Sequence, residues 1–578
     1  MIRTTLRAGA AALAIVPLLA PLGFAQEAAI FDEMDRIHPI WAEHGMVAAQ
    51  ERMAAEIGRD ILAAGGNAVD AGVAVAFALA VTLPRAGNIG GGGFMIVHDA
   101  EKGETRAIDY REMAPAKAER DMFLDAEGNA DSEKSLYSGA ASGVPGTVAG
   151  MKAALDAYGS MEWAEVIAPA IKLAEEGYAV TPELADSLES ERENLEKFDS
   201  TKAVFFKEGG EAYRPGDTLI QADLAATLKK IAAEGPDGFY KGEVAEKIAT
   251  AVQEAGGAIT VEDMANYKVA MREPVRGTYR GYEVVSMPPP SSGGVHLIQM
   301  LNALEGYPIS ALGQNSGQTI HLMAEVMKLA YADRSEYLGD PDFVDVPVDA
   351  LTSKEYAADM RAKISADFAR PSADIKPADL APYESDQTTH FSIIDKDGNA
   401  VSNTYTINLN YGSGLVAGGT GVLMNNEMDD FSAKPGVPNA FGLVGGDANA
   451  IEAGKRPLSS MTPTMVLKDG KVWLVTGSPG GARIITTVLQ VVMNMIDHGM
   501  NVAEASTAPR VHHQWLPDEL RIEEGISLDT QRILQAKGHT LALKEIMGST
   551  QSIMRDPENG SLYGASDPRR PDAATLGY

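Results

Sequence analysis

The stretch Gln387-Thr-Thr-His-Phe-Ser-Ile-Ile-Asp-Lys-Asp-Gly-Asn-Ala-Val-Ser-Asn-Thr-Tyr-Thr-Ile-Asn408 decides the fold. Two runs rich in β-branched and aromatic residues flank a turn signal, Lys396-Asp-Gly398, and this pattern predicts a β-hairpin. A three-residue loop with Gly398 in the left-handed conformation pairs Asp395 with Asn399. A two-residue Asp-Gly loop would shift the register by one residue and turn every side chain to the other face.

The three-residue loop also fixes how the two ends of the hairpin meet. In that register Thr388 lies opposite Thr406. A surface hairpin whose threonines serve only β-propensity is the alternative that these residues alone leave open. The side chains expected on the face of Thr388 are those of Ser392, Ser402 and Thr404.

Hydrophobic and turn patterns organise the rest of the chain. The Ala- and Val-rich run Ala68–Leu83 predicts a helix packed on all sides, preceded by a helix over Met46–Ala64 that stops at a Gly-Gly pair. The chain becomes β-rich after Thr388, with helices returning near its end. The strands expected there are 391–395, 400–407, 415–424, 464–468 and 472–476, and the helices are 481–498 and 529–537.

Composition excludes several classes of protein. The 578 residues include 49 Lys and Arg against 80 Asp and Glu, for a net charge of −31. This acidic balance argues against nucleic acid as a partner, because phosphate binding needs a basic surface. The absence of cysteine excludes disulfides, thiolate metal sites and a cysteine nucleophile. A hydrophobic fraction of 45% is enough for a large core, in several domains or in one large α/β unit.

The first residues predict export. Arg3 and Arg7 precede the apolar run Ala8–Ala20, and Gly23-Phe-Ala25 offers small residues for signal peptidase before Gln26. We therefore expect residues 1–25 to be a signal peptide. A transmembrane anchor is the alternative, but the run is short for a span of ~20 residues and contains prolines.

Three further motifs resemble known functional motifs but lack the residues or the spacing that those motifs require. The Gly-rich stretch Asn88–Phe94 lacks the Lys-Ser/Thr of a P-loop and predicts a close backbone approach instead. His512 and His513 are adjacent, so their side chains point to different faces and do not predict a metal site. Gly477-Ser-Pro-Gly-Gly481 has the wrong spacing for a nucleophile elbow.

Six motifs together resemble the bacterial gamma-glutamyltransferases, which are N-terminal-nucleophile hydrolases. The resemblance covers nearly all of the chain after the signal peptide. It is carried by Asp109-Tyr-Arg-Glu-Met-Ala-Pro115, Met287-Pro-Pro-Pro-Ser-Ser-Gly-Gly294, Gln387-Thr-Thr-His390, Met428-Asp-Asp-Phe431, Arg456-Pro-Leu-Ser-Ser-Met461 and Gly477-Ser-Pro-Gly-Gly481.

The resemblance implies a precursor that cuts its own chain between Gln387 and Thr388. Residues 26–387 would become a large subunit and residues 388–578 a small catalytic subunit, which together form a heterodimer. The cut has a chemical purpose, since a freed amine with a pKa near ~7.7–8.0 can act as base for the hydroxyl of Thr388. Thr406 corresponds to the family threonine that hydrogen-bonds the nucleophile.

The resemblance also implies a set of substrate contacts. A γ-glutamyl group ends in an α-amino acid, so the site must satisfy one carboxylate and one ammonium, and backbone donors must stabilise the oxyanion. The implied residues are Arg111, Ser459 and Ser460 for the carboxylate, Asn408, Glu427 and Asp430 for the ammonium, and Gly480 and Gly481 for the oxyanion. Position 427 is Gln in some relatives.

One position departs from many bacterial relatives. Pro435–Asn449 resembles the loop that covers the pocket, where the covering residue is commonly Tyr and here is Phe441. The ring can still exclude water, but the hydrogen bond of the hydroxyl is lost. The balance between transfer and hydrolysis is therefore open.

The expected fold is α+β, a four-layer αββα sandwich built from both subunits. The expected reaction is ping-pong transfer of a γ-glutamyl group from glutathione or a similar compound to water, an amino acid or a peptide, without metal or cofactor. The expected compartment is periplasmic or extracellular, without nucleic acid or a stable membrane anchor. A cephalosporin or glutaryl acylase of the same fold and an exported γ-glutamyl-peptide binding protein are the alternatives; the binding protein would need no chain cleavage.

Overall fold

Two seven-stranded sheets lie face to face in the computed structural model, which describes residues 36–375, 388–434, 443 and 445–578. All strand pairs within these two sheets are antiparallel. The first sheet has the order β1 (Ile40–Ala42), β20 (Leu562–Ser566), β19 (Gln551–Arg555), β15 (Lys471–Gly477), β14 (Thr464–Lys468), β9 (Tyr282–Ser286) and β8 (Val275–Tyr279). The second has the order β21 (Ala574–Gly577), β2 (Met46–Ala49), β10 (Thr389–Ile394), β11 (Ala400–Thr406), β3 (Gly92–Asp99), β4 (Glu104–Tyr110) and β7 (Ala270–Arg272).

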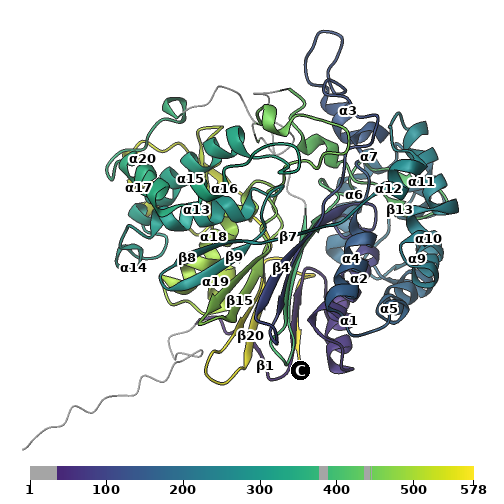
Figure 1. The fold of residues 1–578 in the computed structure, drawn as a ribbon, viewed down its shortest axis with the longest axis horizontal. Coiled ribbons are helices and arrows are strands. Elements are labelled where there is room, and N and C mark those ends of the chain that lie inside the picture. Colours follow the sequence, from purple (N-terminus) through teal and green to yellow (C-terminus); the bar gives the residue numbers. More distant parts are fainter. Residues whose placement is uncertain (1–35, 376–387, 435–442, 444) are drawn as a thin grey trace, which may run out of the picture.

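Helices cover the outer face of each sheet (Figure 1). The helices beside the second sheet are α1 (Arg52–Ala63), α2 (Ala68–Thr82) and α4 (Thr147–Tyr158), with α5 (Trp163–Glu176), α9 (Ala222–Glu234) and α11 (Gly242–Glu254) further out. The helices beside the first sheet are α13 (Gly293–Leu304), α18 (Arg483–Ile496) and α19 (Val502–Thr507), with α15 (Gly317–Tyr337), α17 (Lys354–Ala362) and α20 (Leu528–Ala536) outside them. The predicted four-layer αββα sandwich is confirmed.

Short elements complete the described chain. The remaining helices are α3 (Ser132–Tyr137), α6 (Pro182–Ser190), α7 (Arg192–Leu195), α8 (Asp199–Phe205), α10 (Asp237–Tyr240), α12 (Val261–Asn266), α14 (Ile309–Leu312) and α16 (Val348–Leu351). The remaining strands are β5 (Tyr178–Ala179), β6 (Thr218–Leu219), β12 (Val416–Ala417), β13 (Val422–Leu423), β16 (Val511–His512), β17 (Leu520–Glu523) and β18 (Leu541–Lys544).

The predicted hairpin register is confirmed. Gly398 has φ +90°, and its N–H donates to Asp395 O at 3.1 Å. Asp395 N–H in turn donates to Asn399 O, and Thr389 of β10 lies opposite Tyr405 of β11. Continued by one residue, this register sets Thr388 against Thr406 where the hairpin ends.

The space between the sheets is partly polar because one face of the hairpin carries hydroxyl groups. Ser392 Oγ donates to Gln551 O at 2.9 Å, and Ser402 Oγ donates to Thr476 O at 3.1 Å. These bonds join the second sheet to β19 and β15 of the first. The residues predicted to lie on one face of the hairpin therefore do lie on one face, and this face packs against the first sheet.

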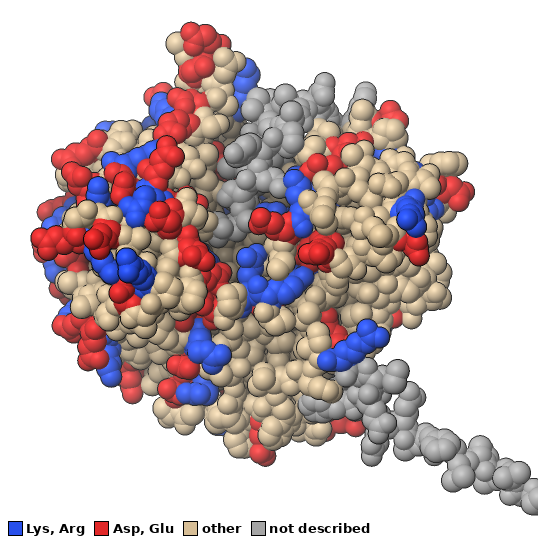
Figure 2. All heavy atoms as spheres, turned by 180° about the vertical axis from the view of Figure 1, so that it is seen from behind, with Lys and Arg blue, Asp and Glu red and all other residues tan. Residues whose placement is uncertain are grey.

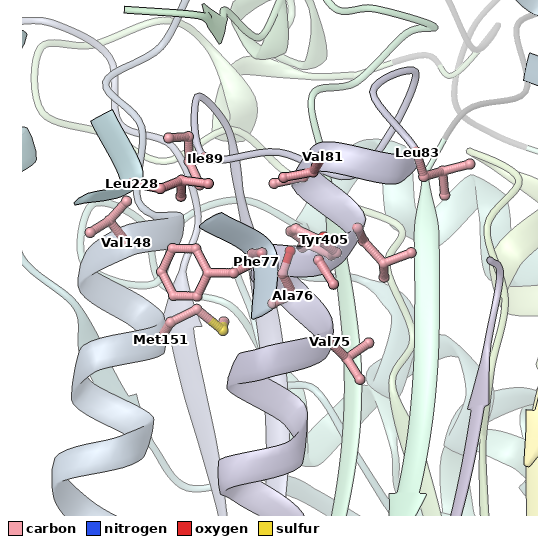
Figure 3. Packing of buried hydrophobic residues seen from close by; sticks show 14 of the residues in the cluster. Val75, Ala76, Phe77, Val81, Leu83, Ile89, Val148, Met151, Leu228 and Tyr405 are labelled. Carbon is pink, nitrogen blue, oxygen red and sulfur yellow. Dashed lines mark hydrogen bonds between the residues drawn. The ribbon is translucent and has the colours of Figure 1, made fainter. Parts of the chain in front are cut away.

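Helix α2 is buried along its whole length, as predicted from its uniform Ala and Val content. Figure 3 shows Phe77 of α2 between Val148 and Met151 of α4, close to Leu228. Phe77 also makes an edge contact with Trp163, with ring centroids 5.5 Å apart. Burial of an aromatic ring of this size is worth about 1.5–3 kcal/mol, so Phe77 holds α2 against the neighbouring helices. The hydroxyl of Tyr405 donates to Ala76 O at 2.9 Å and joins α2 to the hairpin.

Two sequence predictions were wrong in detail. The helix expected over Met46–Ala64 begins at Arg52, because Met46–Ala49 pairs with β10 and β21 as strand β2. The strand expected over residues 415–424 is a pair of two-residue strands, β12 and β13, with Gly419 at φ +68° between them. In the first case the helical periodicity of the sequence was overridden by pairing with distant strands.

Figure 2, the view from behind, shows acidic side chains interspersed with basic ones over the helical lobe around α9–α11. Among the described residues, no helix is long and apolar enough to cross a membrane. The predicted signal peptide, Gln387 and Phe441 lie outside the described residues.

Candidate active site

One pocket collects most of the residues that the motifs single out. Its predicted lining residues are Arg111, Thr388, Thr406, Asn408, Glu427, Asp430, Ser459, Ser460 and Gly481. Its remaining lining residues are Arg334, Leu443, Met461 and Ile484. Gly480 directly precedes a lining residue, and Leu443 belongs to the segment in which Phe441 was expected to cover the pocket.

Thr388 and Thr406 stand at the two ends of the hairpin and are both buried. Asn408 N–H donates to Thr406 Oγ1 at 2.8 Å, and Asn88 Nδ2 donates to Thr406 O at 2.9 Å. Asn88 opens the Gly-rich stretch, in which a Cβ at Gly91 would overlap Thr406 O. The expected close backbone approach is therefore present, and it fixes the position of Thr406.

His390 lies two residues after Thr388 and is fully buried between the sheets. Its Nδ1 is 2.8 Å from Thr404 Oγ1 and its Nε2 is 3.1 Å from Ser392 Oγ. Burial lowers the pKa of His390 to about 3, so the ring is neutral at physiological pH. Both nitrogens are engaged in packing the hairpin, which leaves no nitrogen to act as base for Thr388.

Arg111 follows directly after β4 and is held by Asp109. Arg111 N–H donates to Asp109 Oδ1 at 3.0 Å, and Arg272 Nε donates to the other oxygen of that carboxylate at 2.7 Å. The guanidinium of Arg111 bonds to Glu427 and to Asp430. The residue expected to bind a carboxylate therefore lies against the acids expected to bind an ammonium.

Three carboxyl groups surround this one guanidinium. Burial raises the pKa values of Glu112, Glu427 and Asp430, although the charge of Arg111 opposes the rise in each. The pKa of Glu112 is raised to about 7. Burial lowers the pKa of Arg111, but the three carboxylates together hold it above its ordinary value. Carboxylates this close repel one another and favour retention of a proton. One guanidinium therefore does not balance the charge of the three carboxyl groups around it.

Several buried oxygens in and beside the pocket lack hydrogen-bond donors. Asn408 Nδ2 donates to Asn426 O at 2.9 Å, which assigns the amide and directs Oδ1 elsewhere. Within the described chain, Asn408 Oδ1, Glu427 Oε2 and both carboxyl oxygens of Glu112 have no hydrogen-bond partner. Asn408 also has φ +74°, a conformation that Asn tolerates better than most residues.

The serine pair on the other side shows the opposite polarity. Ser459 Oγ accepts from Met461 N–H at 3.1 Å, and Ser460 Oγ accepts from Arg334 Nη2 at 3.1 Å. A hydroxyl that accepts in this way keeps its own hydrogen for a further acceptor. Sequence reasoning missed Arg334; its only signal was a charged residue near the end of the largely apolar segment that forms α15.

Gly480 and Gly481 precede α18, with φ +132° and +53°. Both are buried, and their N–H groups have no acceptor among the residues that the structure describes. Buried donors without acceptors are rare, and here they lie next to the N-terminus of a helix, where negative charge is stabilised. This arrangement can stabilise an oxyanion.

One cluster of potential metal ligands occurs in the described chain, formed by His321, Glu325 and His539. His321 Nδ1 lies 2.8 Å from His539 Nε2, and Lys328 Nζ lies 2.7 Å from Glu325 Oε1. The lysine already supplies the positive charge that a metal ion would bring, so the cluster does not fit a metal site.

The two adjacent histidines singled out from the sequence also point to different partners. His512 Nδ1 lies 2.8 Å from Thr486 Oγ1, and His513 Nε2 lies 3.3 Å from Asp518 Oδ1. The two rings therefore do not converge on one point.

Comparison with known proteins matches these features to one family. A family model described as Gamma-glutamyltranspeptidase matches residues 54–577. The chain belongs to the gamma-glutamyltranspeptidase family. It is 61% identical over 547 residues to a glutathione hydrolase proenzyme of Escherichia coli (strain K12), covering 94% of each chain.

Two solved structures extend the comparison. A cephalosporin acylase from Bacillus halodurans has a TM-score of 0.84 at 31% identity and covers 98% of this chain and 99% of its own. The gamma-glutamyltranspeptidase of Helicobacter pylori has a TM-score of 0.56 at 52% identity, over 56% of this chain and 93% of that one. The chain therefore resembles both a structure named a cephalosporin acylase and one named a gamma-glutamyltranspeptidase, and the chemistry of the pocket has to distinguish between them.

Proposed function

We propose that this protein is a γ-glutamyltransferase and glutathione hydrolase that matures by cutting itself before Thr388. It takes the γ-glutamyl group of glutathione or a related compound and passes it to water, an amino acid or a peptide. The observation that carries this proposal is the polarity of the pocket. The serine hydroxyls and the guanidinium of Arg111 can bind an anion, and Asn408 Oδ1 and Glu427 Oε2, which have no hydrogen-bond donor, can bind a cation beside them.

An α-amino acid zwitterion satisfies the anion-binding and the cation-binding groups of the pocket at the same time. Its carboxylate replaces Glu427 or Asp430 on the fork of Arg111, while its ammonium takes the acidic oxygens that are released. The donor carboxylate takes the place of an acidic side chain on Arg111, and that side chain pairs with the donor ammonium instead. The ammonium also adds positive charge to the group of three carboxyls around Arg111. A γ-glutamyl group bound in this way extends its acyl carbon toward Thr388.

In the proposed maturation, Thr388 Oγ attacks the carbonyl carbon of Gln387. The C–N bond breaks as the ester forms, the nitrogen of Thr388 takes up the hydroxyl proton, and water then hydrolyses the ester. The products are a carboxyl group on Gln387 and an amine on Thr388. That amine has an ordinary pKa near ~7.7–8.0 and serves as the base that His390 cannot supply.

Turnover repeats this chemistry on the donor. The amine of Thr388 accepts the hydroxyl proton while Oγ attacks the γ-carbonyl, and the N–H groups of Gly480 and Gly481 stabilise the oxyanion. The proton then goes to the leaving amine, which departs as cysteinylglycine when the donor is glutathione. Water or an amine attacks the γ-glutamyl ester in the second half of the ping-pong cycle.

An acylase for cephalosporin or glutaryl side chains is the second candidate, favoured by the structural likeness to the cephalosporin acylase. A glutaryl group has the carboxylate but no ammonium. It would leave Asn408 Oδ1 and Glu427 Oε2 buried without a donor, at a cost of about 1–3 kcal/mol for each group. The acidic side of the pocket therefore favours γ-glutamyl donors.

The proposal includes the parts of the chain around the site. Residues 1–25 act as a signal peptide that directs the protein to the periplasm or the medium, residues 26–387 form the large subunit, and residues 388–578 form the small one. Position 441 is phenylalanine, which lacks the hydroxyl that a tyrosine would offer. No metal or cofactor takes part.

The test is steady-state kinetics of the purified protein with glutathione, with and without an acceptor dipeptide. The proposal expects glutamate as product without acceptor and γ-glutamyl-dipeptide with it. An acylase would instead prefer glutaryl amides, and a binding protein would retain glutathione unchanged.

A further inference from the structure

Arg334 is a buried arginine of α15 that lines the candidate active site. Burial lowers its pKa to about 10, which still leaves the guanidinium charged at neutral pH. Its side chain bonds to two hydroxyl groups, with Nε donating to Ser292 Oγ at 2.9 Å and Nη2 donating to Ser460 Oγ at 3.1 Å. No carboxylate of the described chain forms an ion pair with it. The carboxylate of Asp430 partly offsets the effect of burial on the pKa of Arg334 without contacting it. A buried, charged group that faces a pocket and forms no salt bridge requires a functional explanation.

The bonds of Arg334 determine the direction of the hydrogen bonds around it. Ser460 Oγ accepts from the guanidinium, and its own O–H has no acceptor among the residues that are described. Ser292 Oγ accepts from Nε and donates to Ser459 O at 2.8 Å, and Ser459 N–H donates to Pro290 O at 2.9 Å. One guanidinium therefore fixes the side chain of Ser460 and, through Ser292, the backbone of Ser459.

Charge gives Arg334 a second role. Arg111 is already surrounded by Glu112, Glu427 and Asp430, so the charge around it is negative before a donor binds. A carboxylate that approaches Arg111 meets this negative charge as well as the guanidinium. Arg334 is the second cation of the pocket, and it stands on the side of the serine pair.

We propose that Arg334 is the positioning residue of the carboxylate subsite. It directs the hydroxyl hydrogen of Ser460 toward the α-carboxylate of the donor. Its own positive charge adds to that of Arg111, which three neighbouring carboxyl groups largely offset. This inference rests on the proposed function, because it assigns a role within the same donor site. It predicts that Arg334 reads the carboxylate of the donor and not its ammonium.

Three chromogenic p-nitroanilide donors separate these roles. The γ-glutamyl anilide has both charged groups, the glutaryl anilide lacks the ammonium, and the 4-aminobutanoyl anilide lacks the carboxylate. Arg334→Gln should raise KM by about 10-fold or more for the first two donors, since a bond to a charged group is lost. The 4-aminobutanoyl donor should change less than about 3-fold, and kcat should change less than KM.

Ser460→Ala tests whether Arg334 acts through this hydroxyl. The single change should reproduce part of the KM effect, and the double variant should lose less than the sum of the two single losses. Arg334→Lys keeps the charge but cannot reach Ser292 and Ser460 with one planar fork, so its KM should lie between wild type and Arg334→Gln. Arg521→Gln is the matched control, because Arg521 is equally buried, has a pKa also lowered to about 10 by burial, and does not line the pocket.

Equal losses on all three donors, or additive losses with Ser460→Ala, would overturn the role of Arg334. If Arg334→Gln does not mature on a denaturing gel, Arg334→Lys is measured in the same way and the same outcomes decide. Wild-type protein that shows no turnover of the γ-glutamyl anilide would instead refute the proposed function, so the two failures are distinguishable.

Discussion

His390 lies directly opposite Thr404 across the β10–β11 hairpin, with Nδ1 of the imidazole 2.8 Å from Oγ1 of the threonine. This pair lies two residues inside the end of the hairpin, where the register sets Thr388 against Thr406. Because both ring nitrogens are bound and burial depresses the pKa of His390, the ring packs the hairpin beside the proposed nucleophile and does not titrate near neutral pH. The base for Thr388 must therefore come from elsewhere, and the amine released by chain cleavage is the group that fits.

The packing of this histidine predicts the cost of a small change. Gly477→Ala places a Cβ into the ring of His390, which is pinned by Thr404 and Ser392 and cannot move aside. We expect a loss of about 1–3 kcal/mol in unfolding free energy, measured by urea denaturation. Gly418→Ala is the control, because the nearest atom there, Ser200 Cβ, is 3.8 Å away. A Gly477→Ala variant as stable as the control would refute the packing argument.

Arg111→Lys should raise KM for γ-glutamyl donors and leave chain cleavage intact. Lysine keeps the charge, but a single ammonium cannot bond side by side to Glu427 and Asp430 or to a carboxylate in the same geometry. We expect a KM increase of ~10-fold or more, measured with the γ-glutamyl anilide. An unchanged KM would remove Arg111 from the carboxylate subsite.

Asp430→Asn tests the substrate class. Loss of the charged partner of the donor ammonium should cost about 2–5 kcal/mol, or at least ~30-fold in kcat/KM for glutathione. Glutaryl donors, which lack the ammonium, should lose far less, so the ratio of kcat/KM between the two donors is the quantity to measure. Equal losses would mean that Asp430 supports Arg111 or the fold, and the acylase reading would gain ground.

The carboxyl cluster around Arg111 predicts a pH dependence. Burial raises the pKa of Glu112 to about 7, so the cluster gains a proton as the pH falls through that value and attracts an ammonium less strongly. The kcat/KM ratio of γ-glutamyl to glutaryl anilide should therefore fall below pH ~7 and level off above it, whereas titration of the Thr388 amine affects both donors alike. A ratio that stays constant from about pH 5 to about pH 9 contradicts this account; Glu112→Gln should weaken the dependence.

Local patterns predicted the elements nearest the site. The turn at Gly398 determined the register of β10 and β11, and the uniform apolar content of Ala68–Thr82 predicted a helix buried on every side. Both rest on short-range chemistry that a sequence displays directly. The strand Met46–Ala49 was missed because its character comes from pairing with β10 and with the C-terminal β21, far away in the chain.

The site itself was predictable only in part. The motifs named most of the residues that line the pocket, yet the direct pairing of Arg111 with Glu427 and Asp430 depends on the folding of two distant segments. Arg334 was missed because its helix, α15, carries both solvent-facing and buried charges, and only the fold shows which of them face the pocket. Hydrogen-bond direction, the argument that distinguishes the two sides of the pocket, has no counterpart in a linear sequence.

The central claim is that Thr388 becomes an N-terminal nucleophile, and intact-mass analysis of the purified protein tests it most directly. The account predicts two chains, the smaller one with the mass of residues 388–578 and threonine as its first residue. Thr388→Ser should give the same cut with some activity, and Thr388→Ala should give one uncut chain without activity. A smaller chain that begins elsewhere, or a Thr388→Ala variant that still splits between Gln387 and the substituted residue, would contradict the claim.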